Sequence, residues 1–230
     1  MAPELAFLLL GDGRFPAGGH AHSAGVEAAV ADGRIGDLDG LASFARERLR
    51  TAGLVDAALA AATAVRLGSG GEPAEAVLRR LDGEADARMV APPTRTASRR
   101  QGRQLVRVAS RCWPDPVLAA AGLAAPEGLH LAVATGAVAV AAGLDGPGAA
   151  RLVVHATIAA PAGAAVKLLG LDPFAVAALW AELGPEAERA AADAVARAAG
   201  PIEDLPSATS PLHEIAAVEH AARDLRLFVT

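Results

Sequence analysis

Residues 10–27 read L-G-D-G-R-F-P-A-G-G-H-A-H-S-A-G-V-E, and the interpretation of the whole chain starts from this stretch. Four glycines and a proline fall within residues 11–19. A helix cannot continue through so many of them, and a central strand would not tolerate the proline, so the stretch predicts an ordered loop. Ser23 is a good helix N-cap, and Glu27 falls where the positive end of a helix favours an acid. We therefore expect a short helix over Ser23–Ala31.

This loop is compatible with more than one kind of site. It has neither the G-x-x-x-x-G-K-[ST] pattern nor a G-x-G-x-x-G after a strand, which argues against a nucleotide site. His20 and His22 could chelate a metal, although two ligands are fewer than a closed site needs; alternatively, both brace the loop with hydrogen bonds. Asp12, His20 and Ser23 could form a triad, but no G-x-S-x-G pattern or oxyanion hole accompanies them.

The same stretch carries a family resemblance. Residues Asp12–Glu27 resemble the N-terminal signature of the UreF family of urease accessory proteins, in which a Pro-x-Gly-Gly core precedes a small-His-Ser and a Gly-apolar-Glu. His20 stands where that family usually has an aromatic residue. The matching positions are Pro16, Gly18, Gly19, His22, Ser23, Gly25 and Glu27. We expect Gly18 and Gly19 to hold backbone angles, or a close approach, that a side chain would spoil.

Composition predicts an all-α fold. The chain has 230 residues, of which 53% are hydrophobic, and alanine makes up much of that share. Aromatic residues amount to 3%, and tyrosine is absent. Because alanine is the best helix former, we expect a single-domain bundle of roughly ten helices over residues 1–230, with helices in close approach.

Charge and cysteine content narrow the function classes. The net charge of −5 argues against nucleic acid as the main partner. Cys112 is the one cysteine, which excludes an intramolecular disulfide and a Cys-rich metal site; beside Trp113 it is expected to be a small core residue.

No targeting or membrane-spanning segment is expected. The apolar run Leu5–Leu10 follows no basic region and is too short for a signal sequence. The stretches 131–144 and 152–166 lack the length of about 18 residues that a membrane span needs, so buried helices are expected there. A cytoplasmic protein follows from these observations.

Helix signals recur along the rest of the chain. We expect Asp37 or Asp39 to cap a helix that Gly53 kinks, Pro73 to open a helix reaching about Val90, and Asp172-Pro173 to open another. Pro126-Glu127 and Gly184-Pro185-Glu186 are expected to start two more helices, and Leu212 a last one.

An arginine-rich helix is predicted after Pro92-Pro93. No acid lies between Asp86 and Asp115. Most of the arginines share one broad helical face, which is either a solvated basic face or a docking face for an acidic protein patch. The run R-x-A-S-x-x-Q-G-R-x-L from Arg95 also resembles a second UreF motif. The arginines are Arg95, Arg99, Arg100, Arg103, Arg107 and Arg111.

Three later segments extend the resemblance over most of the chain. His130, Val133 and Gly136 resemble the H-x-x-V-x-x-G segment of the family, and Lys167 takes the basic position of another motif. Asp172-Pro173 departs from the Gly-Gln that the family commonly has there. The closing pattern matches at Pro211, Ile215, His220, Arg226, Leu227 and Phe228. By itself, a C-terminal Arg-Leu-Phe is expected to be frayed or captured by a partner.

The resemblance implies a function. UreF-like proteins are helical, dimeric chaperones without enzymatic activity, and they bridge the accessory protein UreD (also called UreH), the GTPase UreG and apo-urease so that nickel reaches the urease active site. No cofactor is implied, and His20 and His22 are the only candidate metal ligands. The implied partner-binding residues are Pro16, Gly18, Gly19, His22, Ser23, Glu27, Arg95, Arg99, Arg103, Lys167, His220, Arg226, Leu227 and Phe228. The alternatives are a metal-dependent hydrolase using His20, His22 and an acid, and a regulator of a GTPase unrelated to urease.

Overall fold

The computed structural model describes residues 1–208, 210–223 and 227–228, without the side chain of His20. The described part of the chain is built from helices and contains no strand, so the all-α prediction is confirmed. The elements are α1 (Pro3–Gly11), η1 (Gly19–Ala21), α2 (Val26–Ala31), α3 (Leu38–Arg50), α4 (Ala52–Ser69), α5 (Ala74–Arg88), α6 (Pro92–Cys112), α7 (Pro116–Ala124), α8 (Leu131–Ala141), α9 (Gly146–Leu169), α10 (Pro173–Ala198), η2 (Ile202–Asp204) and α11 (Pro211–Ala221).

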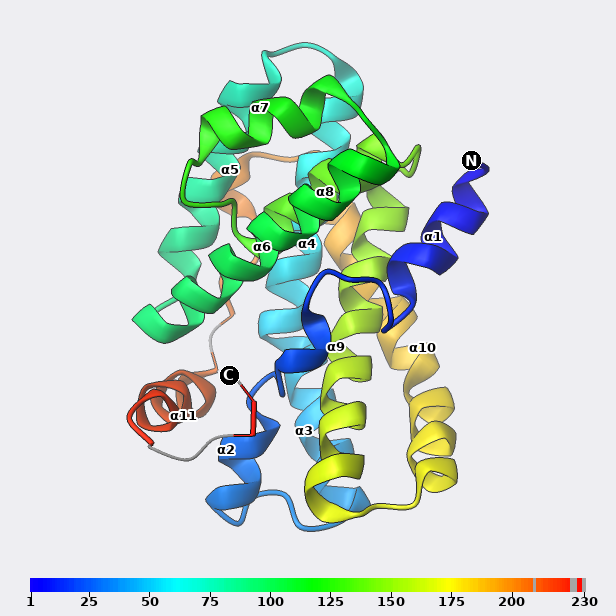
Figure 1. Cartoon of the computed structure of the whole chain (residues 1–230), viewed down its shortest axis with the longest axis vertical. Helices are drawn as coiled ribbons and strands as arrows, with labels where there is room; N and C mark the ends of the chain where they lie inside the picture. Colours follow the sequence, from blue (N-terminus) through cyan, green and yellow to red (C-terminus); the bar gives the residue numbers. More distant parts are fainter. Residues whose placement is uncertain (209, 224–226, 229–230) are drawn as a thin grey trace.

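Helix α4 lies at the centre of the bundle. It packs against α8, α9 and α10, and its residues from Ala57 to Ala64 are all buried. Figure 1 shows α9 and α10 running lengthwise beside it, with α6 and α8 across the upper half. Helix α11 lies apart from this core and contacts α2 and α6.

Small residues allow the close approach expected of an alanine-rich core. A Cβ at Gly136 of α8 would collide with the carbonyl oxygen of Ala60 on α4. A Cβ at Gly102 of α6 would collide with the carbonyl oxygen of Leu129. Backbone therefore meets backbone where α8 crosses α4 and where the segment before α8 crosses α6, and no side chain fits between them.

Several helix boundaries follow the predicted signals. The side chains of Asp37 and Asp172 accept hydrogen bonds from Gly40 N (2.8 Å) and Phe174 N (3.0 Å) at the starts of α3 and α10. The break between α3 and α4 falls at Thr51, two residues before the expected kink at Gly53.

Three boundaries were predicted wrongly. The helix expected from Ser23 begins at Val26, because Gly25 takes a φ of +90° that an α-helix cannot contain. The helix expected from Pro126 begins at Leu131, because Gly128 has a φ of +106°. Pro185 starts no helix but lies inside α10, where the packing of this long helix on α4 and α9 outweighs the one backbone hydrogen bond that proline removes.

The prediction that Cys112 is a core residue is also wrong. It is exposed at the end of α6, whereas Trp113 is half-buried with its ring 6.1 Å from that of Phe15. Since α6 ends at Cys112, the side chain that turns toward the core is the next one.

Two stretches are long and apolar enough to cross a membrane by length and composition alone, namely Leu38–Ser69 and Gly146–Leu169. In this structure α4 and α9 pack on each other and on α10. Buried core helices of an all-helical bundle meet the same criteria. Helix α9 contains the stretch 152–166 that was expected to be a buried helix, but it runs for 24 residues, so the expected shortfall in length is wrong. Leu38–Ser69 was not singled out from the sequence.

Candidate functional site

The glycine-rich loop between α1 and α2 is tied to the arginine-rich helix α6. Gln104 of α6 donates a hydrogen bond from Nε2 to the carbonyl oxygen of Pro16 at 3.0 Å. Phe15 is buried in the core beside Trp113. The loop is therefore ordered, as the sequence predicts, and these contacts determine its path along α6.

Glycine is required at two positions of this stretch, and only one of them was predicted. Gly18 has a φ of +84°, which side-chain-bearing residues rarely adopt. Gly19 has no positive φ, and a Cβ added there would meet no atom within 4 Å, so the expectation for it is wrong. Gly25 combines a φ of +90° with a collision between a Cβ and the imidazole of His213.

The carboxylate of Glu27 holds the C-terminal end of the chain. Its Oε1 accepts a hydrogen bond from Leu227 N at 2.6 Å, and its Oε2 accepts one from Phe228 N at 3.0 Å. His220 Nε2 lies 2.8 Å from the same Oε2. We call Glu27, His220, Leu227 and Phe228 the clasp, because they join residues 200 positions apart in the sequence.

The clasp is partly buried and electrostatically compensated. Phe228 packs into the core, and the Lys167 ammonium lies 5.7 Å from its ring centre. Burial raises the pKa of Glu27, but the hydrogen bonds from Leu227, His220 and Phe228 outweigh burial, so the pKa lies below its ordinary value.

The clasp decides one of the two expectations for the tail. Leu227 and Phe228 are bound by their own chain through Glu27, so they are not frayed. Capture of the tail by a partner stays a prediction. Arg226, the remaining predicted residue of the tail, lies outside the described residues. Five of the predicted partner-binding residues thus come together at one place: Glu27, Lys167, His220, Leu227 and Phe228.

The predicted metal pair is seen only in part. His22 and Ser23 both make contacts with their surroundings, and Ser23 Oγ accepts a hydrogen bond from Glu27 N at 3.3 Å. The side chain of His20 lies outside the described residues. Among the described residues, no three His, Cys, Asp or Glu side chains gather as ligands of a metal ion would.

A cavity of about 1310 Å³ opens beside the loop and the clasp. Residues of the loop, α4, α6, α9 and α11 line it, and Phe228 and His220 of the clasp close part of its wall. The charged or titratable side chains that line it include Arg48 of α3, Asp56 of α4 and His213 of α11. We call these three the groove cluster.

The groove cluster is poorly compensated. Arg48 NH1 lies 3.3 Å from His213 Nε2, but its buried Nε has no hydrogen-bond partner among the described residues. No ion pair joins Arg48 to Asp56 in that part of the chain. The guanidinium carbon lies 5.9 Å from the ring centre of Phe44. Opposite charges therefore share a cavity without forming a direct contact.

The pKa values of the groove cluster are displaced in the directions that burial dictates. Burial raises the pKa of Asp56 to about 6, against the attraction of Arg48 and with the support of Glu214. Burial, aided by Arg48 and Arg34, lowers the pKa of His213 to about 3. Burial also lowers the pKa of Arg48. Displaced pKa values in a cavity are a recognised indicator of a functional site.

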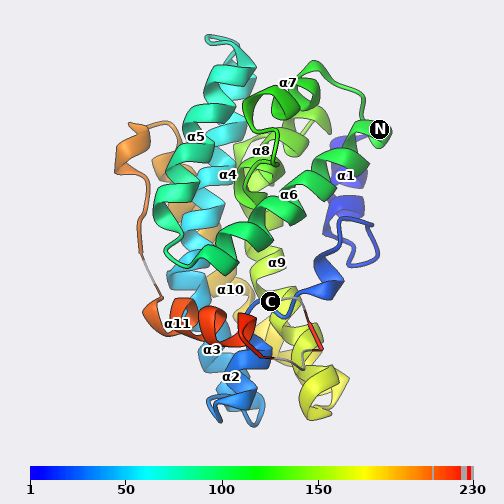
Figure 2. The ribbon, with the colours of Figure 1, turned by 60° about the vertical axis from the view of Figure 1, so that its left-hand side comes forward.

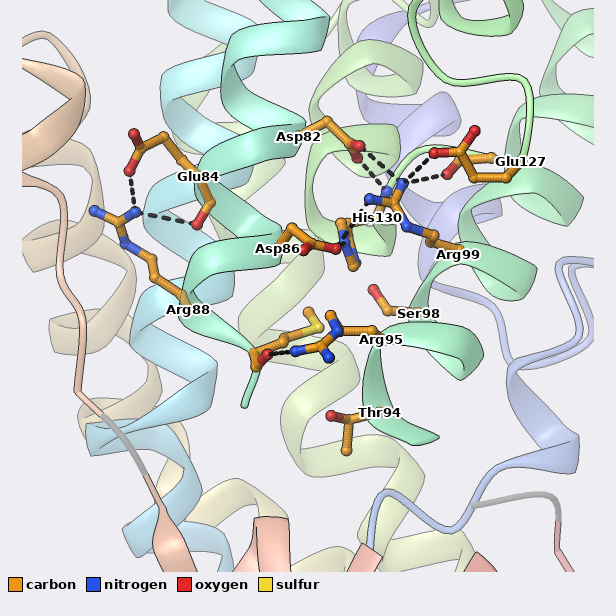
Figure 3. A network of polar contacts seen from close by, with 12 residues as sticks. Asp82, Glu84, Asp86, Arg88, Thr94, Arg95, Ser98, Arg99, Glu127 and His130 are labelled. Carbon is orange, nitrogen blue, oxygen red and sulfur yellow. Dashed lines mark hydrogen bonds and ion pairs between the residues drawn. The ribbon is translucent and has the colours of Figure 1, made fainter. Parts of the chain in front are cut away.

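A second set of charges, buried at Asp82 and His130 and partly exposed elsewhere, joins α5, α6 and the start of α8 (Figure 3). Arg99 NH1 lies 2.8 Å from Asp82 Oδ2, and Arg99 NH2 lies 3.1 Å from Asp86 Oδ1. His130 donates its backbone N–H to Asp82 Oδ1 at 2.7 Å, and its Nε2 lies 3.1 Å from Asp86 Oδ1. Glu127 completes the set at 3.4 Å from Arg99. We call these five residues the hub.

Charges in the hub compensate one another. Burial lowers the pKa of Arg99, but the hydrogen bond and charge of Asp82 and the hydrogen bond of Asp86 outweigh burial and raise it overall. Burial raises the pKa of Asp86, but His130 and Arg99 lower it overall. Burial dominates at His130 and lowers its pKa. The hub therefore has the character of a structural ion-pair network.

The three arginines predicted to bind a partner bond to their own chain. Arg99 belongs to the hub, and Arg95 donates to the carbonyl oxygen of Met89 at 2.6 Å and to that of Val90 at 3.0 Å. Arg103 donates to the carbonyl oxygen of Glu127 at 3.1 Å. Figure 3 shows Arg95 and Arg99 directed toward α5 and its C-terminal end.

Sequence reasoning missed the acids of the hub and most of the groove cluster. Asp82 and Asp86 lie four residues apart on α5, directly before an arginine-rich helix, and this spacing was an available signal. Arg48 and Asp56 lie on different helices, and their meeting with His213 follows from no local pattern.

Comparisons with known proteins agree on one family. The family model UreF matches residues 35–184. A urease accessory protein UreF from Mycolicibacterium vanbaalenii is 42% identical over 230 residues, which is all of both chains. Proteins of the same name from Mycobacterium sp. (strain JLS) and Mycobacterium tuberculosis (strain H37Rv) are 43% identical over 230 residues, the whole of both chains, and 38% identical over 228 residues, 99% of both.

Proposed function

The chain belongs to the UreF family of urease accessory proteins, and we propose that it is a non-enzymatic adaptor in the assembly of the urease metallocentre. It bridges UreD/UreH, the GTPase UreG and apo-urease, so that nickel reaches the urease active site. It acts in the cytoplasm as a homodimer and influences GTP hydrolysis by UreG.

One observation carries this proposal. The similarity to proteins named urease accessory protein UreF extends over the whole chain at 38–43% identity. It includes the N-terminal loop and the C-terminal tail, which lie outside the matched family model and meet in the clasp. An adaptor needs such ordered surfaces and needs no catalytic group.

Exposed apolar residues support an assembly function. Leu212, Ile215 and Val218 of α11 are 65%, 56% and 49% exposed, and they recur at a spacing of three residues along one side of the helix. Leu227 of the clasp is 70% exposed. Contiguous exposed apolar side chains are typical of surfaces that other protein chains cover.

The test is complementation of a strain that carries the urease genes but whose own copy of this gene has been deleted. Expression of the chain should restore urease activity and the nickel content of urease, and UreD/UreH and UreG should co-purify with it in stoichiometric amounts. A nickel-loaded, active urease in the uncomplemented strain would contradict the proposal. So would the absence of both partners from the purified material.

Two measurements separate this function from the alternatives. GTP hydrolysis by UreG should change when the adaptor complex is added, whereas a regulator of an unrelated GTPase would leave it unchanged. Light scattering of the purified chain should give the mass of a dimer. Metal-dependent hydrolysis by the isolated chain that His22→Ala abolishes would support the hydrolase instead.

A further inference from the structure

Most arginines of this protein are engaged by their own chain, but one group on α6 is not. Arg46, Arg79, Arg80, Arg88 and Arg151 illustrate the usual case, since each pairs with a glutamate. Within the described part of the chain, five exposed arginines have no hydrogen bond and no ion pair. They are Arg100, Arg107 and Arg111 of α6, and Arg189 and Arg197 of α10.

The three on α6 form a line. They are spaced seven and four residues apart, which places them within an arc of about 40° around a helix of 3.6 residues per turn. At about 1.5 Å per residue, they span about 16 Å along the helix axis. We call Arg100, Arg107 and Arg111 the arginine ridge. It lies on α6, which crosses the near side of the fold in Figure 2.

Arg99 and Arg100 show how the two sides of α6 differ. Arg99 turns toward α5, and its guanidinium contacts Asp82, Asp86 and Glu127. Arg100 is the next residue, and a rotation of about 100° leaves it exposed and unpaired. The positive charge of the arginine ridge is therefore surplus to what the fold uses.

The surroundings of the ridge favour an acidic protein over other polyanions. No acid lies on α6, so nothing on the helix competes for the ridge. Among the described residues, no exposed large apolar side chain lies between Val90 and Leu123, so the ridge lacks the apolar residues that insert into a membrane. No aromatic residue interleaves the arginines, as stacking on nucleic-acid bases would require, and the chain carries a net charge of −5.

We propose that the arginine ridge docks an acidic α-helix of a partner protein, with carboxylates at the matching spacing of four and seven residues. The inference rests on the proposed adaptor function for the identity of that partner, which is one of the assembly proteins. It moves the docking surface from Arg95, Arg99 and Arg103 to the three arginines that the fold leaves unpaired. Because the ridge is exposed, its main contributions are to the rate and specificity of association.

A peptide measurement tests the ridge without any assembly protein. The probe is a fluorescent helical peptide with glutamates spaced four and seven residues apart, and its control is an isomer with the same glutamates spread around the helix. Fluorescence anisotropy should show that the first peptide binds, and R100Q/R107Q/R111Q should raise its Kd about tenfold or more. The reason is that each exposed ion pair lowers Kd by up to about fivefold. The matched control R189Q/R197Q should bind as the wild type does.

Two outcomes of this measurement overturn the proposal. One is equal binding of the two peptide isomers, or of the ridge variant and the wild type. The other is tighter binding of a single-stranded oligonucleotide, or of vesicles containing phosphatidylserine, than of the matched peptide, with the same loss in the ridge variant.

The same variants then enter the assembly. In co-purification with UreD/UreH, UreG and apo-urease, the ridge variant should lose one partner at physiological salt, and R189Q/R197Q should lose none. If the wild type binds none of the three, the proposed adaptor function is wrong. The peptide measurement alone then determines whether the arginine ridge binds acidic helices. If the wild type binds and the ridge variant binds equally well, the ridge proposal is wrong and the adaptor function stands.

Discussion

The hub and the groove cluster both place charged side chains between helices, but they treat those charges in opposite ways. In the hub, Arg99 contacts three carboxylates, and the pKa of Asp86 is lowered. In the groove cluster, Arg48 and Asp56 share a cavity without a direct contact, and the pKa of Asp56 is raised to about 6. We therefore expect the first arrangement to stabilise the fold and the second to cost it stability.

This difference separates charges that contribute to the stability of the fold from charges that do not. Compensated buried charges hold helices in register, as the hub does for α5, α6 and α8. Uncompensated charges beside a large cavity have no such benefit, and pKa values displaced in this way are typical of functional sites. The clasp lies between the two cases. Its carboxylate, Glu27, is compensated by hydrogen bonds, and it binds Leu227 and Phe228, which line the same cavity.

The largest effect is expected from Asp82→Asn in the hub. The carboxylate of Asp82 is only 9% exposed and accepts hydrogen bonds from Arg99 and from the backbone of His130. Its loss should lower the free energy of unfolding by about 3 kcal/mol, measured by urea denaturation. Glu75→Gln, which breaks an exposed pair with Arg79, should change it by less than about 0.5 kcal/mol. Similar values for the two variants would remove the distinction between the hub and a surface pair.

The groove cluster should respond in the opposite direction. The folded-state pKa of Asp56 lies above its ordinary value of 3.8, so its contribution to stability is present at low pH and is lost as pH rises through about 6. Asp56→Asn should therefore raise the free energy of unfolding by about 1–2 kcal/mol at pH 8, and the gain should shrink as pH falls toward 4.

The control for that prediction is Asp193→Asn at an exposed position of α10, which should have little effect at either pH. Destabilisation by Asp56→Asn at pH 8 would show that Asp56 compensates Arg48 after all, and the contrast with the hub would fail. The pH dependence of stability has the opposite sign at His213, whose pKa is lowered to about 3. The unfolded chain binds a proton at this histidine below pH 6.5, its ordinary pKa, and the folded chain does not. Wild-type stability should therefore fall as pH drops below 6.5.

Breaking the clasp should strongly increase amide exchange at the tail and lower the free energy of unfolding by a smaller amount. Glu27→Gln removes the charge that accepts hydrogen bonds from Leu227, Phe228 and His220. Hydrogen exchange at the Leu227 and Phe228 amides should accelerate strongly, while the free energy of unfolding falls by about 1–2 kcal/mol. Because the pKa of Glu27 is lowered, this stability is present above about pH 4.5 and is lost as pH falls through the folded-state pKa.

The matched control is Glu219→Gln, on the exposed side of α11 beside His220. Its tail amides should exchange at the wild-type rate. Unchanged exchange in Glu27→Gln would mean that the burial of Phe228 holds the tail without the carboxylate.

The smallest effect separates two neighbouring glycines of the loop. Gly18→Ala should cost about 1 kcal/mol, because alanine is strained at a φ of +84°. Gly19→Ala should change stability by less than about 0.5 kcal/mol, since its φ is ordinary and nothing lies near its Cβ position. Equal losses in thermal unfolding would show that the motif glycines matter for a reason other than backbone angle.

Local signals in the sequence were enough for the helical class and for most helix ends. Alanine content predicts the all-α fold. Asp172 is predicted as a cap, and Asp37 is one of two candidates for another, because a cap acts on amides within three residues of itself. The family motifs also marked Glu27, His220 and Phe228 before their contacts were known. Pro185 was misread because a proline is a local signal, whereas the packing that keeps α10 continuous is not local.

Only the tertiary structure decided what each of these residues contacts. Sequence spacing could place Arg99 and Arg100 on a helix, but the position of α5 determined that one joins the hub and the other stays exposed. The same holds for the clasp, whose carboxylate and amides are 200 residues apart, and for the groove cluster, whose members come from three helices. Periodicity fixes the direction of a side chain relative to its own helix, and the pKa, burial and pairing of that side chain depend on which other helix packs there.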